Sequence, residues 1–136
     1  NPRRYLKFYN ANQSEIWIRT GTNKAPEEVH KNIPIYKEVA FVNKQGREII
    51  KIKNGKIQPS DSLKNVRYPK NTTYKCETYF SKTIGIAPGE IYVSHLNGFY
   101  VSKKEQLQGV ERVDEAIEGK KYDGVIRFAM PLYRNG

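Results

Sequence analysis

The sequence has few of the residues on which metal-binding and catalytic motifs depend. Its 136 residues include one cysteine, Cys76, and two histidines, His30 and His95. A single cysteine excludes an internal disulfide and a multi-cysteine metal site, and the histidines lack the spacing of a metal-ligand pair or a charge relay. His30 is expected to be structural or exposed. The chain also has no P-loop and no Gly-x-Gly-x-x-Gly fingerprint. We expect no metal, no cofactor and no enzymatic activity.

The possible nucleophiles lack the partners that would activate them. Ser94 is not in a Gly-x-Ser-x-Gly elbow, and no basic residue can be assigned to Cys76 by spacing. Both are expected to be buried small residues. The carboxylates Asp114, Glu115 and Glu118 are scattered and indicate a solvated acidic face.

Long apolar runs are also missing. No run approaches the roughly 18 residues that span a bilayer, and the residues Asn1 to Arg4 lack the apolar segment of a signal peptide. The length suits one domain, residues 1–136. The chain starts without Met and ends on the turn signal Asn135-Gly136, so we expect a fragment of a longer polypeptide in which one more strand follows.

Acidic residues are outnumbered, with 14 Asp and Glu against 24 Lys and Arg and a net charge of +10. Such a charge attracts polyanions, acidic lipid surfaces or small anions without choosing among them. Basic pairs such as Arg3-Arg4 and Lys103-Lys104 are spread evenly and lack a nucleic-acid-binding pattern, so no nucleic-acid partner is expected. A basic domain that binds single-stranded nucleic acid through strand aromatics remains an alternative.

The first half of the sequence predicts a helix end, strands and one hairpin. Helical spacing covers Pro2 to Tyr9, and alternation predicts a strand over Glu15 to Thr20. Pro26 with its acidic neighbours favours the start of a short helix. β-Rich residues on both sides of Asn43 to Gly46 predict a hairpin of residues 36–42 and 47–52.

The second half predicts a helix that leads into a hairpin. The helix is expected from Thr72 or Thr73 to Gly85, and a strand over Glu90 to Ser94. Asn97-Gly98 favours a tight turn, after which Phe99 to Val101 would pair with that strand. The apolar run within Tyr122 to Tyr133 predicts a central strand. The expected fold is α+β, with a PAS-like antiparallel sheet of about five strands flanked by helices and loops.

Arg127 is the charged residue with the strongest claim to a role, because it interrupts the last apolar run. If its side of the strand meets the predicted helix, its guanidinium would lie near Lys75, Tyr79 or Tyr92. A fork of donors there suits a carboxylate or another small anion. Ser94 and His95 would add hydrogen bonds. A structural ion pair of Arg127 with Glu77 or Glu90 remains an equal alternative.

Three stretches resemble the extracytoplasmic Cache sensor domains of bacterial chemoreceptors, histidine kinases and diguanylate cyclases. They are the hairpin from Phe41 to Ile52, the passage from Tyr74 to Leu96, and the end from Tyr122 to Gly136. Together they cover about half of the chain in the family's order. The resemblance implies a periplasmic, PAS-like domain of a membrane-anchored receptor that binds a small molecule between sheet and helix.

Carried over to this sequence, the resemblance implies a pocket lined by Tyr79, Phe80, Tyr92, Ser94, Arg127 and Ala129. The tyrosine, arginine, tryptophan and aspartate signature of amino-acid-binding members is not found around Tyr79, so amino-acid sensing is not supported. The receptor could be a homodimer. A domain that only dimerises or contacts another protein is a third alternative, and it predicts a tightly packed helix–sheet junction without a cavity.

Overall fold

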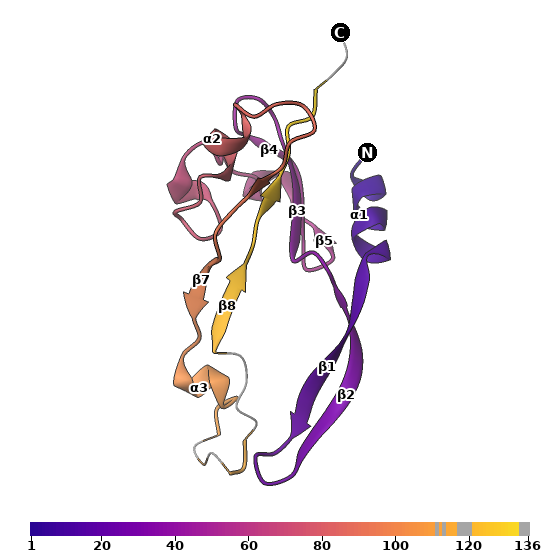
Figure 1. The fold of residues 1–136 in the computed structure, drawn as a ribbon, viewed down its shortest axis with the longest axis vertical. Helices are drawn as coiled ribbons and strands as arrows, with labels where there is room; N and C mark the ends of the chain where they lie inside the picture. The colour runs from indigo at the N-terminus through magenta and orange to yellow at the C-terminus, as the bar shows by residue number, and fades with distance from the viewer. Residues whose placement is uncertain (111, 113, 117–120, 134–136) are drawn as a thin grey trace.

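The computed structural model describes residues 1–110, 112, 114–116 and 121–133 and shows a small α+β fold. A body of short elements carries two long arms, which meet again at their far ends (Figure 1). The helices of the described residues are α1 (Pro2–Ala11), α2 (Tyr79–Thr83) and α3 (Lys103–Gln106), with 3-10 turns η1 (Ser60–Ser62) and η2 (Pro69–Asn71). The strands are β1 (Gln13–Gly21), β2 (Pro26–Pro34), β3 (Glu38–Val42), β4 (Glu48–Lys53), β5 (Lys56–Ile57), β6 (Tyr92–Val93), β7 (Asn97–Tyr100), β8 (Tyr122–Val125) and β9 (Phe128–Ala129).

The strands of the described residues pair antiparallel in four separate sheets. Their orders are β1-β2, β3-β4-β5, β6-β9 and β7-β8. The α+β class and the antiparallel pairing agree with the sequence. A single sheet of about five strands is not formed by the pairing within these residues.

The core lies in the body and is small. Tyr9 of α1, Ile52 of β4 and Val66 are almost completely buried, at 1%, 0% and 2% exposure. Helix α1 begins at Pro2, with the Asn1 side chain accepting a hydrogen bond from the Arg3 N–H, and it packs against β4 and β5.

The predictions for the first half are confirmed except one. Helix α1, strand β1 and the β3–β4 hairpin are all present. The short helix expected from Pro26 is wrong, because Pro26–Pro34 forms strand β2 and pairs with β1 along its whole length. Nine ladder partners outweigh the local helix-start signal of a proline and two acidic residues.

The predicted helix from Thr72 or Thr73 starts much later, at Tyr79. Lys75 has a left-handed backbone, with φ of 59°, which breaks a helix at that point. The backbone N–H groups of Tyr74 and Glu77 donate to the Glu77 carboxylate and the Thr72 hydroxyl. These local side-chain bonds replace the helical ladder, as threonine and acidic side chains commonly do.

The hairpin expected at Asn97-Gly98 is also wrong. These residues belong to strand β7, which pairs with β8, while β6 pairs with β9. Gly98 lies opposite Gly124, and a Cβ on Gly98 would come within 2.6 Å of the Gly124 Cα. The glycine is therefore used for close strand approach, and a turn is not formed there.

The central strand expected over Tyr122 to Tyr133 is divided into β8 and β9. Arg127 lies in the break, with its N–H donating to the Ser94 hydroxyl at 2.8 Å. Its apolar neighbours are not covered on both faces: Ile126 is 53% exposed and Phe128 is 66% exposed. Asn135-Gly136 and Glu118 lie outside the described residues.

Candidate functional site

A chain of buried ion pairs joins the β3–β4 hairpin to the last strands. Arg127 donates from Nη1 to Glu38 at 2.9 Å, and from Nε and Nη2 to Glu77 Oε1 at 2.9 and 2.8 Å. Lys51 lies between Glu38 and Glu48, at 3.5 and 2.8 Å. The alternative of a structural ion pair between Arg127 and Glu77 is thus confirmed, and Glu38 is a second carboxylate partner.

The ion pairs favour the charged forms of Glu38 and Arg127. Burial alone would raise the pKa of Glu38, but Arg127 and Lys51 outweigh it and lower that pKa below the usual 4.5. Burial would likewise lower the pKa of Arg127, and the attraction of Glu38 and Glu77 raises it instead. The guanidinium is therefore a permanent cation in a largely dry setting.

Tyr79 lies directly beside this chain of charges. The Arg127 guanidinium carbon is 4.6 Å from the centre of the Tyr79 ring, a cation–π distance. Burial raises the pKa of the Tyr79 hydroxyl far above its usual value, although Arg127 opposes that shift. The hydroxyl therefore stays protonated over the physiological range and can act as a hydrogen-bond donor.

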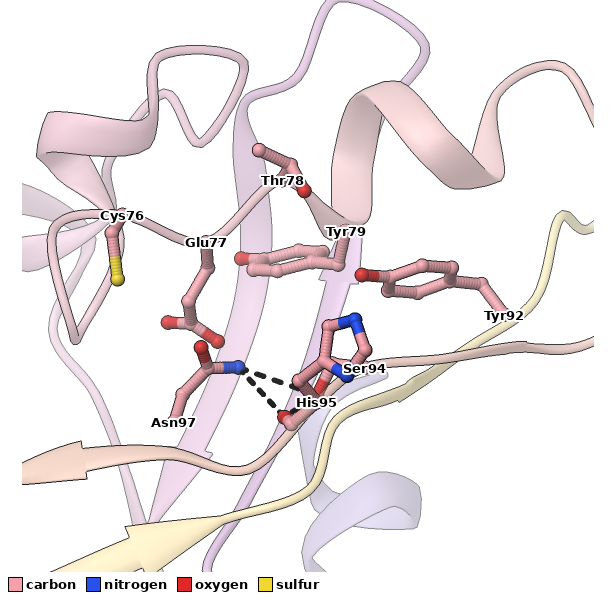
Figure 2. A pocket seen from close by; sticks show the side chains of 8 residues that line it. All are labelled: Cys76, Glu77, Thr78, Tyr79, Tyr92, Ser94, His95 and Asn97. Carbon is pink, nitrogen blue, oxygen red and sulfur yellow. Dashed lines mark hydrogen bonds between the residues drawn. The ribbon is translucent and has the colours of Figure 1, made fainter.

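Glu77 and Tyr79 also line a small pocket (Figure 2). Its volume is about 160 Å³. The lining side chains come from the segment before α2, the first residue of α2, and β6 with the residues that follow it: Cys76, Glu77, Thr78, Tyr79, Tyr92, Ser94, His95 and Asn97.

The floor of this pocket is fixed by hydrogen bonds. The Ser94 hydroxyl donates to the His95 carbonyl at 2.7 Å and accepts from the Arg127 N–H. The Asn97 amide donates to the Ser94 hydroxyl and to the His95 carbonyl at 3.3 and 3.1 Å. These bonds connect the pocket directly to the strand break at Arg127.

The predicted binding residues are divided between two cavities. Tyr79, Tyr92, Ser94 and His95 line the small pocket. Phe80, Arg127 and Ala129 line a larger groove of about 810 Å³, and Tyr79 borders both cavities. Lys75 is exposed and lines neither. The roles of all eight residues in ligand binding stay predictions.

Sequence reasoning missed Glu38, Glu48 and Asn97. Glu48 is 1% exposed, and Glu38 is the first residue of β3. Each glutamate follows a basic residue and comes directly before an apolar run, so neither interrupts such a run as Arg127 does. Asn97 was missed because its pairing with glycine indicated a turn.

Cys76 and Ser94 are less buried than expected. Cys76 is exposed, and Ser94 is partly buried and occupied by hydrogen bonds, so the expectation that Cys76 is buried is wrong. The described residues contain no cluster of three potential metal ligands and no helix long and apolar enough to cross a membrane.

Comparison with protein-family models, with curated proteins and with solved structures finds no match for this chain.

Proposed function

We propose that this chain is the ligand-binding part of a PAS-like extracytoplasmic sensor from a membrane-anchored bacterial receptor. The observation that carries the proposal is the small pocket, where Tyr79, Tyr92, Ser94 and His95 converge from two segments beside Glu77, the buried partner of Arg127. Hydroxyl, imidazole, amide and aromatic groups around one cavity are typical of a small-molecule site. The resemblance to Cache sensors supports the same function.

The pocket suits a small polar ligand. Its 160 Å³ equals roughly five times the volume that one water occupies in the liquid. The two tyrosine rings can cover apolar parts of such a molecule, and the Tyr79 hydroxyl, His95 and Asn97 can bond its polar atoms. A cavity beside the helix–sheet junction also favours ligand binding over the ligand-free interaction domain.

The ligand is still proposed to be an anion, but groups other than Arg127 would bind it. Three nitrogens of Arg127 already bond to Glu77 and Glu38, so an anion could reach the guanidinium only by displacing a carboxylate. An anion in the small pocket would instead use His95 and the Tyr79 hydroxyl, because both N–H groups of the Asn97 amide already donate. A small ammonium compound would use Glu77 and the faces of the tyrosines, so both charge classes need testing.

The proposed signal is a shift in the population of two conformations. A ligand that contacts Glu77 or Ser94 changes the position of groups bonded to Arg127, and Arg127 is bonded to Glu38 on β3. The ligand can favour one arrangement only by the difference in its affinity for the two. The break between β8 and β9 would transmit the conformational change from the pocket to the rest of the fold.

A thermal-shift screen tests this proposal. Small carboxylates and small ammonium compounds are compared at one ionic strength, and a ligand should raise the melting temperature of the chain. Tyr92→Phe removes a hydroxyl from the pocket and should weaken the binding of that ligand by up to about tenfold. Tyr100→Phe is the matched control, because Tyr100 is 87% exposed and lies outside the pocket. The proposal fails if neither class raises the melting temperature, or if both variants lose the same affinity.

A further inference from the structure

The larger groove is bordered by the edges of two strands. Its 810 Å³ is lined by every residue of Tyr36–Lys44 and every residue of Val125–Tyr133. Successive side chains of a strand point to opposite faces, so a cavity that touches all of them in turn meets the strand edge and not one face. Figure 1 shows the last strand beside β3, in agreement with this lining.

The β3 edge directs unpaired backbone groups into the groove. The Lys37 carbonyl accepts from Asn54, and the Asn43 N–H donates to Arg47, so the odd-numbered residues here face β4. By alternation, the N–H and C=O of Glu38, Ala40 and Val42 face the groove. Within the described residues, β3 pairs with no strand other than β4.

The β9 edge is arranged in the same way. The Arg127 carbonyl accepts from the Ser94 N–H, so Arg127 faces the β6 side. By the same alternation the backbone groups of Phe128 in β9 face the groove, and so do those of Met130 if the extended chain continues one residue beyond the strand. Inside the groove, the Thr83 hydroxyl is buried without a hydrogen-bond partner among the described residues. The groove thus has polar backbone groups on both sides. An occupant that displaces water from the groove must form hydrogen bonds with them.

Side chains from α1 and from the α2 region cover the two faces of the groove. Phe41 packs on Tyr5 of α1, with ring centres 6.4 Å apart, on one face of β3. Glu38 points to the opposite face, where it meets Arg127 beside Tyr79. Since Phe80 and Ile84 also line the groove, a strand placed in it would be covered on both faces. Strands of that kind have apolar residues at successive positions.

A second copy of the described strands does not fit. An occupant that pairs with both β3 and β9 must have two free edges. Each strand of the described residues already pairs with a neighbour along at least one edge. Two copies at +10 each would also repel one another.

We propose that this groove is an acceptor site for one extended, apolar β-strand, supplied by a polypeptide segment outside the described residues. The strand pairs with Glu38, Ala40 and Val42 on one side and with Phe128 and Met130 on the other. It joins the β3-β4-β5 and β6-β9 sheets into one sheet with the order β5-β4-β3-strand-β9-β6.

The test uses a synthetic peptide with the intact chain. The probe is a fluorescent octapeptide of alternating valine and isoleucine between two terminal glutamates, and its control carries two central prolines, which cannot donate backbone hydrogen bonds. The valine–isoleucine peptide should raise its anisotropy on binding and bind at least about tenfold more tightly than the proline peptide. Hydrogen exchange should slow in both Tyr36–Lys44 and Val125–Tyr133.

A variant of the acceptor edge completes the test. Ala40→Pro removes an N–H that faces the groove and leaves the β3–β4 ladder intact, since proline is tolerated at strand edges. It should abolish peptide binding while the melting temperature stays close to that of the wild type. If Ala40→Pro unfolds the chain, peptide binding is measured with Ile84→Asp instead, because Ile84 lines the groove and is 52% exposed. Ile84→Asp should weaken peptide binding by at least tenfold.

Several results would overturn the proposal. Equal binding of both peptides, slowed exchange at one edge alone, or loss of binding in neither variant would each exclude a strand paired on both sides. Competition by a fatty acid with no change in backbone exchange would assign the groove to a small lipophilic molecule. Sedimentation that shows self-association through this face, lost in Ile84→Asp, would assign it to a second copy.

Discussion

At the scale of single residues, Arg127 is the most consequential side chain of the body. It is 13% exposed and neutralises two carboxylates, Glu38 and Glu77, that are 8% and 2% exposed. Arg127→Met would leave both acids buried without their main partner, and removing one member of a buried ion pair costs about 3–5 kcal/mol. We expect Arg127→Met to lose unfolding free energy of that order in urea denaturation. Arg112→Met is the control, because Arg112 is 67% exposed, and its loss should stay within about 0.5 kcal/mol.

The pH dependence of that loss separates charge from packing. In the wild type the folded pKa of Glu38 is lowered, so its stabilising effect is complete above the usual 4.5 and is lost as pH falls through the folded pKa. In Arg127→Met, Glu38 has lost this partner and can be protonated more readily. The difference in unfolding free energy between wild type and variant should therefore shrink between pH 7 and pH 4. A difference that stays constant over this range would mean that the lost contacts of Arg127 are mainly packing.

At the scale of elements, the β7–β8 arm depends on two glycines that face each other. Gly98 lies opposite Gly124, and a Cβ at Gly98 would press on the backbone of Asp123 and Gly124. Gly98→Ala should destabilise the chain by about 1–3 kcal/mol, as overpacking does. Gly85→Ala is the matched control, because nothing lies within 4 Å of a Cβ there. Equal urea midpoints for the two variants would show that β7 and β8 are free to move apart.

The elements that could be predicted from the sequence are those held by local patterns. Alternation and a loop of turn residues located β3 and β4, and helical spacing located α1. The failures come from contacts that these patterns do not show. β2 is a strand because β1 lies beside it, and the segment before α2 is not helical because Thr72 and Glu77 bond its backbone. Asn97-Gly98 has a strong turn signal, yet Gly98 is needed opposite a residue that lies far away in the sequence.

The candidate site could be predicted in part for the same reason. A charge in an apolar run identified Arg127 as a residue with buried partners, and its pairing with Glu77 was one of the alternatives. The division of the predicted residues between a pocket and a groove could not be predicted, because it depends on the break between β8 and β9. That break places the Arg127 side chain on the groove and its N–H on Ser94 of the pocket.

At the scale of the whole molecule, the β1–β2 ribbon is an arm with little core of its own. The exposed residues of both strands include Trp17 at 65%, whose ring centre lies 3.5 Å from that of His30. A two-stranded ribbon is at best marginally stable by itself in water. At its tip, the Asn23 N–H donates to the Ala116 carbonyl at 2.9 Å and Lys24 pairs with Asp114 at 2.8 Å. Figure 1 shows the tip meeting the end of the other arm.

We expect the tip contact to control local opening of the ribbon. Lys24→Glu places a like charge beside Asp114, which should free the tip and speed amide exchange in β1 and β2 several-fold. The melting temperature should barely change, because the core lies in the body and the residues of the pair are 72% and 33% exposed. Lys31→Glu makes the same charge change on β2, away from the tip, and should leave exchange in the ribbon unchanged. If both variants speed exchange equally, the ribbon responds to total charge, and the joining of the two arms at their tips contributes nothing to its stability.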